Sequence, residues 1–184
     1  ELCATGRTIE LDTIHRFHNT WEAAASLKLR HGDPAGLDAY LDHDRVHVGD
    51  LATITTDVFT AWAKDRARGL DALMLAPTRD LVSQLNQQAQ THRLAGRDPG
   101  TGVRLADGNT AHTGDIIVTR HNNRRLRLGT NDWVKNGDRW TVHHVDPDGS
   151  LAVHHQRSGR PVTLPADYVA AAAELGYAST IHGA

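Results

Sequence analysis

The chain has 184 residues, with 20 Lys and Arg against 22 Asp and Glu, and a formal net charge of -2 when histidine is neutral. Apolar residues make up 39 % and charged residues 23 %, which excludes disorder over most of the chain. The longest fully apolar run, residues 169–173, is far shorter than the roughly 20 residues that cross a bilayer, so we expect no membrane partner. Cys3 is the single cysteine, which excludes an intrachain disulfide and fits a cytoplasmic location.

Positive charge gathers in one part of the sequence. Residues 114–160 carry 8 basic and 5 acidic side chains, whereas residues 1–70 carry 8 basic and 11 acidic ones. A basic stretch in a neutral chain is typical of a phosphate-bearing partner, but also of a solvated face. Charge alone leaves both interpretations open.

Helices are predicted through most of the first half. Asn19 followed by Glu22 is a capping-box pair that begins a helix, and Gly32 ends it. Asp33 before a proline begins the next one. Four helices are expected: 21–30, from 33–34 to about 43, from 50 or 53 to about 69, and 78–94. A short apolar segment, 70–76, precedes the last of them and is predicted to be a buried strand.

The pattern changes near Gly102 to short alternating segments separated by turn residues, which indicates a small β-barrel or sandwich. We expect Ile117 and Trp140 to point inward, and Asn136-Gly137 to form a tight turn in which both residues tolerate positive φ. The predicted strands are 115–119, 139–145, 151–155, 162–164 and 177–181, with a helical or loop return over 165–174. The fold class is therefore α/β with a small β-barrel.

Histidines are numerous, but they do not form a convincing metal site. His143-His144 and His154-His155 fall in neighbouring predicted strands, where adjacent side chains point to opposite faces, and no carboxylate or thiolate ligands accompany them. We therefore expect no metal. The sequence also contains no Gly-x-x-x-x-Gly-Lys phosphate loop, no serine nucleophile elbow and no His-Glu-x-x-His helix.

Three segments together point to a motor protein. Residues 10–17 resemble the helicase strand that ends in an arginine directed at the terminal phosphate of the nucleotide, and Arg16 holds that position. Residues 73–86 are similar to the strand, threonine and helix that open a second RecA-like domain. Residues 176–184 resemble the segment Tyr-Ala-x-Thr-x-His-x-x-Gln-Gly, which contacts single-stranded DNA. Further similarity covers 19–33, 114–123 and 133–142.

Together these segments resemble the helicase part of conjugative relaxases of the TrwC/TraI (TraA-like, MobF) type, which are RecD-like superfamily-1 helicases. The resemblance implies residues 1–113 in the second RecA-like domain, a P-loop NTPase fold, an inserted SH3-like β-barrel at 114–168, and a return strand at 169–184. It also implies that ATP and Mg²⁺ serve the full-length parent, with none bound to this chain, and that partners are single-stranded DNA and the rest of the motor and relaxase. The chain would be a fragment whose nucleotide loop precedes Glu1.

Within this family, Arg16 would be the catalytic and cofactor-binding residue that stabilises γ-phosphate charge. Trp133 and Trp140 could help to guide the strand, although core positions in the barrel explain them as well. The expected nucleic-acid-binding residues are Thr78, Arg120, Arg124, Arg125, Arg127, Thr180 and His182.

The alternative is a non-catalytic module that binds a protein or DNA through the β-barrel, with the helicase likeness only ancestral. The two hypotheses differ in one feature of the parent gene, because only a motor needs a Gly-x-x-x-x-Gly-Lys-Ser/Thr loop in the preceding sequence.

Overall fold

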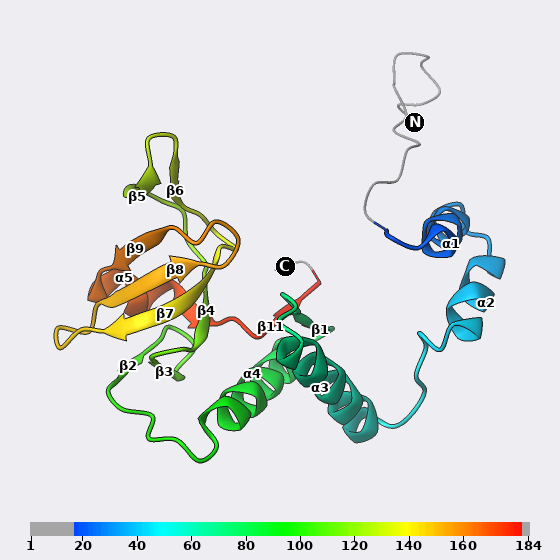
Figure 1. The fold of residues 1–184 in the computed structure, drawn as a ribbon, viewed down its shortest axis with the longest axis horizontal. Coiled ribbons are helices and arrows are strands. Elements are labelled where there is room, and N and C mark those ends of the chain that lie inside the picture. The colour runs from blue at the N-terminus through cyan, green and yellow to red at the C-terminus, as the bar shows by residue number, and fades with distance from the viewer. Residues whose placement is uncertain (1–16, 182–184) are drawn as a thin grey trace. The chain divides into compact units, whose positions relative to one another are not determined.

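The structure is a computed structural model, and it describes residues 17–181 (Figure 1). The chain divides into two compact units, residues 1–54 and residues 55–184. The first unit contains two helices, α1 (Thr20–Arg30) and α2 (Ala35–Asp42), and the first residues of α3 (Leu51–Ala67).

Local capping explains where these helices begin and end. Asn19 is the N-cap of α1, as predicted, but its side chain makes no capping bond to the backbone. It donates from Nδ2 to Glu22 Oε2 at 3.0 Å, so the two residues interact through their side chains. Gly32, at φ 76°, ends α1 in the left-handed conformation that glycine tolerates best. Asp33 Oδ1 accepts from Ala35 N at 3.0 Å, and Asp50 Oδ1 accepts from Thr53 N at 2.8 Å, so both predicted helix starts are confirmed.

The second unit combines a parallel strand pair with a β-rich module. β1 (Met74–Ala76) is followed by α4 (Arg79–Leu94) and pairs in parallel with β11 (Ala178–Thr180), near the end of the chain. The predicted strand 70–76 is thus too long, because only Met74–Ala76 has a partner. Figure 1 shows α3 and α4 beside this strand pair.

The module lies between α4 and β11 in the sequence. Its five-stranded antiparallel sheet has the order β10-β4-β7-β8-β9, and two hairpins, β2-β3 and β5-β6, accompany it. The elements are β2 (Gly102–Arg104), β3 (Thr110–His112), β4 (Ile116–Thr119), β5 (Asn123–Gly129), β6 (Asp132–Val134), β7 (Arg139–Val145), β8 (Leu151–His155), β9 (Pro161–Leu164), α5 (Ala166–Ala172) and β10 (Ala173–Leu175).

Two details of the module differ from the sequence-based expectation. The sequence predicts a helical or loop return where β10 lies, but Ala173–Leu175 pairs with β4 and extends the sheet beyond residue 168. Asn136 does not adopt positive φ, since Asp44 is the only non-glycine residue of the described chain that does. The turn therefore depends on Gly137 alone, at φ 88°.

The core of the module is centred on Trp140. Ile117 and Trp140 are direct partners across β4 and β7, and both side chains are fully buried, as predicted. The indole Nε1 of Trp140 donates to Thr119 Oγ1 at 3.2 Å, and that hydroxyl donates to Lys135 O at 2.7 Å. Trp140 is thus a core residue, and it presents no surface on which a nucleic-acid base could stack.

Candidate nucleic-acid interface

Thr78 and Thr180 lie at the same edge of the parallel strand pair. Thr180 is the register partner of Ala76, the last residue of β1, and Thr78 follows two residues later. Ligands of open α/β sheets bind outside the carboxyl ends of the strands, and this is that edge. Two of the sequence-predicted residues, which are far apart in the sequence, are therefore brought to one edge of the fold.

Thr78 is also the N-cap of α4. Its Oγ1 accepts a hydrogen bond from Leu81 N at 3.3 Å, so the hydroxyl hydrogen remains available to donate. The first backbone N–H groups of a helix have no intrahelical acceptor, and the helix dipole makes this end partly positive. The start of α4 therefore suits a phosphate oxygen.

Asn86 fixes β11 against α4, and the sequence analysis did not single it out. Its buried side chain accepts at Oδ1 from Tyr177 N (2.9 Å) and Ala178 N (2.8 Å), and donates to Leu175 O (3.2 Å). The sequence contained one indication of this role, because Asn86 is a polar amide that directly follows Leu85 on the apolar face of the predicted helix. Asn86 positions Thr180 through the backbone of β11.

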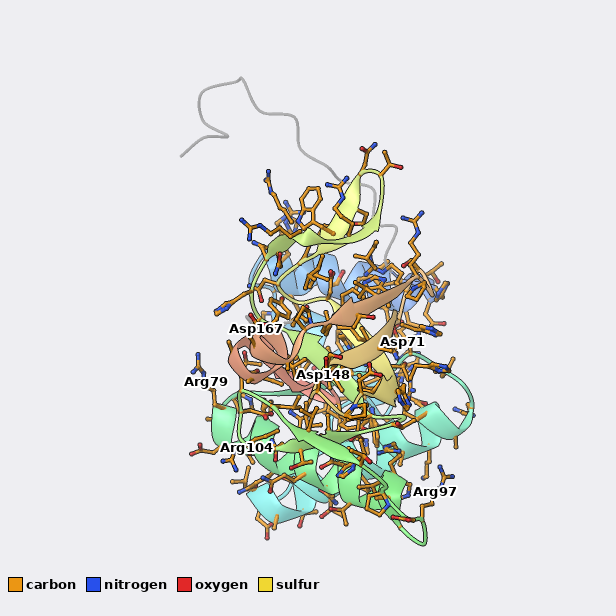
Figure 2. All side chains as sticks on the ribbon, turned by 90° about the vertical axis from the view of Figure 1, so that its left-hand side faces the viewer. Asp71, Arg79, Arg97, Arg104, Asp148 and Asp167 are labelled. Atoms are coloured by element: carbon orange, nitrogen blue, oxygen red, sulfur yellow. The ribbon has the colours of Figure 1, made fainter. Side chains whose placement is uncertain are left out.

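A cavity of about 660 Å³ opens beside this edge. Arg120, at the end of β4, lies in its lining and forms a 2.6 Å ion pair with Glu174. Arg79 also lines it, makes no ion pair with any described residue, and points away from the ribbon in Figure 2. The charged and polar lining residues are Arg79, Asp80, Ser83, Asn86, Asp107, Arg120, Asn136, Glu174 and Thr180.

The remaining predicted arginines lie on the β5–β6 hairpin, which projects from the five-stranded sheet (Figure 1). Arg120 is separate from them, although the four arginines are within eight positions in the sequence. Arg127 is occupied locally, since its guanidinium donates to the carbonyls of Gly129 and Thr130. Arg125 is exposed, and its side chain makes no hydrogen bond or ion pair with a described residue.

Trp133 gives the hairpin an aromatic surface. The Arg124 guanidinium lies 5.0 Å from the centroid of the half-buried ring, and Lys135 Nζ lies 5.5 Å from it. Lys135 also donates to Asp132 Oδ1 at 2.5 Å. This contact lowers the pKa of Asp132 and raises the pKa of Lys135, so both stay charged. The hairpin thus combines cations with a flat ring, as single-strand binding surfaces do.

A buried polar cluster ties the module to α4. The fully buried Asp115 carboxylate accepts from Arg93 Nε at 2.7 Å, Gln90 Nε2 at 2.6 Å, His112 N at 2.8 Å and the Tyr177 hydroxyl at 2.5 Å. Burial, followed by the negative charge of Asp115, raises the pKa of Tyr177. The partners come from α4, β3 and the residue before β11, so this cluster is structural.

The paired histidines do not form a metal centre in the part of the chain that the structure describes. The rings of His143 and His154 are exposed and stacked, 4.9 Å apart. Within residues 17–181 no three His, Cys, Asp or Glu side chains are grouped so that they could hold a metal ion. No described helix is long and apolar enough to cross a membrane. Arg16 and His182, two of the predicted site residues, lie outside the described residues.

Comparison with known families identifies two parts of the chain. Residues 103–173 match the family described as the Rv2311 SH3-like barrel domain, so the module is similar to an SH3-like barrel. Residues 1–51 match the AAA domain family, so the beginning of the chain is similar to P-loop NTPases. No curated protein matches the chain.

Proposed function

We propose that this chain is part of the second RecA-like motor domain of an ATP-dependent DNA helicase, and that it holds the backbone of single-stranded DNA. The observation that carries the proposal is the placement of Thr78 and Thr180 at one carboxyl edge, next to the N-terminus of α4. A hydroxyl, a helix N-terminus and a nearby unpaired arginine are sequence-independent phosphate ligands.

The parent is proposed to be a conjugative relaxase of the TrwC/TraI type that acts in the cytoplasm and moves along single-stranded DNA during plasmid transfer. The AAA-type match over residues 1–51 and the SH3-like match over 103–173 support this order of parts. ATP and Mg²⁺ belong to the complete motor, where Arg16 would face the γ-phosphate. The described residues offer neither a phosphate loop nor a carboxylate cluster for these groups, so no catalytic step is assigned to them.

The β5–β6 hairpin provides the second contact in this proposal. Arg124 and Arg125 would neutralise phosphates, and a base would stack on the layer that the Arg124 guanidinium and the Trp133 ring form together. Arg127 would contribute positive charge to the hairpin surface. Arg120 is paired with Glu174, and it would contribute positive charge to the wall of the cavity. His182, which lies outside the described residues, is also proposed to contact the DNA backbone.

Fluorescence anisotropy with a labelled oligothymidine tests this function at low and at moderate salt. The wild-type chain is expected to bind weakly, and Arg124→Ala/Arg125→Ala should bind less well because two phosphate contacts are lost. Arg104→Ala/Arg157→Ala is the matched control, since it removes the same charge from positions outside the hairpin. Equal binding by the hairpin variant and the wild type would exclude the hairpin as a contact surface.

The SH3-like match also favours a second candidate, a non-catalytic module that docks a protein partner. This candidate predicts no affinity for oligothymidine even at low salt. It also predicts that the parent gene lacks a phosphate-loop sequence before Glu1.

A further inference from the structure

A second cavity, of about 390 Å³, lies at the opposite end of α4 from Thr78. The helix has 16 residues, so at about 1.5 Å per residue the two ends are roughly 24 Å apart. Figure 2 shows Arg97, which lines this cavity, on the opposite side of the view from Arg79. The cavity is thus separate from the proposed DNA edge.

The walls of this cavity are basic and aromatic. Its ionisable lining groups are Arg66, His92, Arg93, Arg97 and the phenol of Tyr177, and no Asp or Glu is among the described residues that line it. Trp62 and Tyr177 contribute rings that meet edge to face, 5.8 Å apart. Three guanidinium groups around one opening repel one another, and an anion bound between them would offset this repulsion.

The positive charge is only partly compensated. Arg97 is exposed and makes no ion pair with any residue in the described part of the chain. Arg66 pairs with Asp71 at 3.9 Å, but that carboxylate is 61 % exposed, so solvent screens the contact. Of the ion pairs that these three arginines make with described residues, only the one between Arg93 and Asp115 is close, at 2.7 Å.

Arg93 supplies the most specific observation. Its Nε donates to Asp115 and its Nη1 to Thr113 O at 3.1 Å, while Nη2 is buried and has no acceptor among the described residues. An unpaired N–H of a charged group is costly to leave without an acceptor. Its neighbour Gly114, at φ 87°, lets the guanidinium approach, because a Cβ there would lie 3.0 Å from Arg93 Nη1.

From this arrangement we infer that the cavity binds a small organic anion, a phosphate or carboxylate joined to a flat ring. The anionic group would accept from the exposed guanidinium of Arg97 and lie beside that of Arg93, and the ring would pack against the part of Trp62 that lines the cavity. A volume of about 390 Å³ is in the range of small-molecule pockets. A nucleoside monophosphate has this chemistry and serves as the probe.

The competing explanation is that these arginines stabilise the C-terminal ends of the helices. Arg66 and Arg93 lie in the last turns of α3 and α4, where cations complement the partial negative charge of the terminal carbonyls. That explanation predicts no ligand. Two measurements distinguish these explanations: whether an anion binds, and whether its affinity depends on Arg97, which lies beyond the end of α4.

The test follows the indole N–H resonance of Trp62 by NMR in the 184-residue chain, with the signal assigned from Trp62→Phe. Adenosine monophosphate should shift this resonance in a saturable way, with adenosine and inorganic phosphate each binding at least about tenfold more weakly. Arg97→Gln should weaken adenosine monophosphate binding about tenfold, as expected for one charged hydrogen bond. Arg104→Gln, an exposed arginine outside the cavity, is the matched control and should bind as the wild type does.

Three results would overturn the inference. The first is no shift of the Trp62 resonance at about 10 mM nucleotide, far above the millimolar affinity of even a weak site. The second is equal loss of affinity in Arg97→Gln and Arg104→Gln, which would mean that only net charge matters. The third is equal affinity for adenosine and adenosine monophosphate, which would show that the phosphate group does not contribute to binding.

Discussion

The Tyr177 hydroxyl donates a 2.5 Å hydrogen bond to Asp115, and this contact joins the residue that leads into β11 to the residue that precedes β4. Arg93 of α4 donates to the same carboxylate oxygen, Asp115 Oδ1, at 2.7 Å. A helix, the end of the chain and the SH3-like barrel therefore meet at one buried carboxylate. The parallel strand pair and the barrel should unfold together because of it.

Asp115→Ala should be one of the most destabilising single substitutions in the chain. It removes the carboxylate partner of Arg93 and leaves several buried donors unsatisfied, which costs about 3 kcal/mol or more. Tyr177→Phe removes one of these hydrogen bonds and should cost about 1 kcal/mol. Urea denaturation followed by circular dichroism measures both. If the two variants were equally stable, Asp115 would not be the junction.

Stability should decline with pH above about 10, the ordinary pKa of tyrosine. The folded chain keeps Tyr177 protonated because its pKa is raised, whereas the unfolded chain releases that proton. The unfolded state therefore binds fewer protons in this range, and the free energy of unfolding falls as pH rises. Tyr177→Phe lacks this group and should lose less stability between about pH 9 and 11. Parallel pH profiles for the two chains would contradict the linkage.

Gly137→Ala should destabilise the SH3-like barrel by about 1 kcal/mol, while Asn136→Ala should have little effect. The reason is backbone conformation alone, since Gly137 has φ 88° and a methyl group added there would meet no atom within 4 Å. Asn136 keeps a negative φ that any residue adopts. Thermal unfolding compares the two. A larger effect at Asn136 would show that the turn needs both residues in the left-handed region.

Thr78→Asp separates the capping role of Thr78 from its proposed DNA contact. Aspartate caps helices as well as threonine does, so the free energy of unfolding should stay within about 0.5 kcal/mol of the wild type. The added negative charge at the proposed phosphate site should nevertheless reduce oligothymidine affinity severalfold. Thr78→Ser keeps both the cap and the hydroxyl and is the control. Unchanged oligothymidine affinity in Thr78→Asp would show that the strand edge at Thr78 does not contact DNA.

Sequence patterns predicted the helices well because their signals are local. Thr78 and Asp50 each accept from a backbone N–H three residues on, so a short window of sequence contains both partners. The prediction of an SH3-like barrel is confirmed by the family match over 103–173, and alternation was sufficient to place Ile117 and Trp140 inside it.

The errors concern features that distant residues decide. Residues 173–175 are part of an alanine-rich stretch with helical propensity, and they form a strand only because β4 offers an edge. Asp115 and Tyr177, 62 positions apart, cannot be paired from periodicity. Arg120 and Arg124 are close in sequence, yet one pairs with Glu174 and the other covers Trp133, because the chain passes from β4 to β5 between them.

The salt dependence of oligothymidine binding tests the central claim most directly, because it counts phosphate contacts. For a single strand, each neutralised phosphate contributes about 0.7 to the slope of log affinity against log salt. If Arg124 and Arg125 each hold a phosphate, the slope for Arg124→Ala/Arg125→Ala should be shallower than that of the wild type by about 1.4. The control Arg104→Ala/Arg157→Ala should retain the wild-type slope. Identical slopes for the hairpin variant and the wild type would contradict the account.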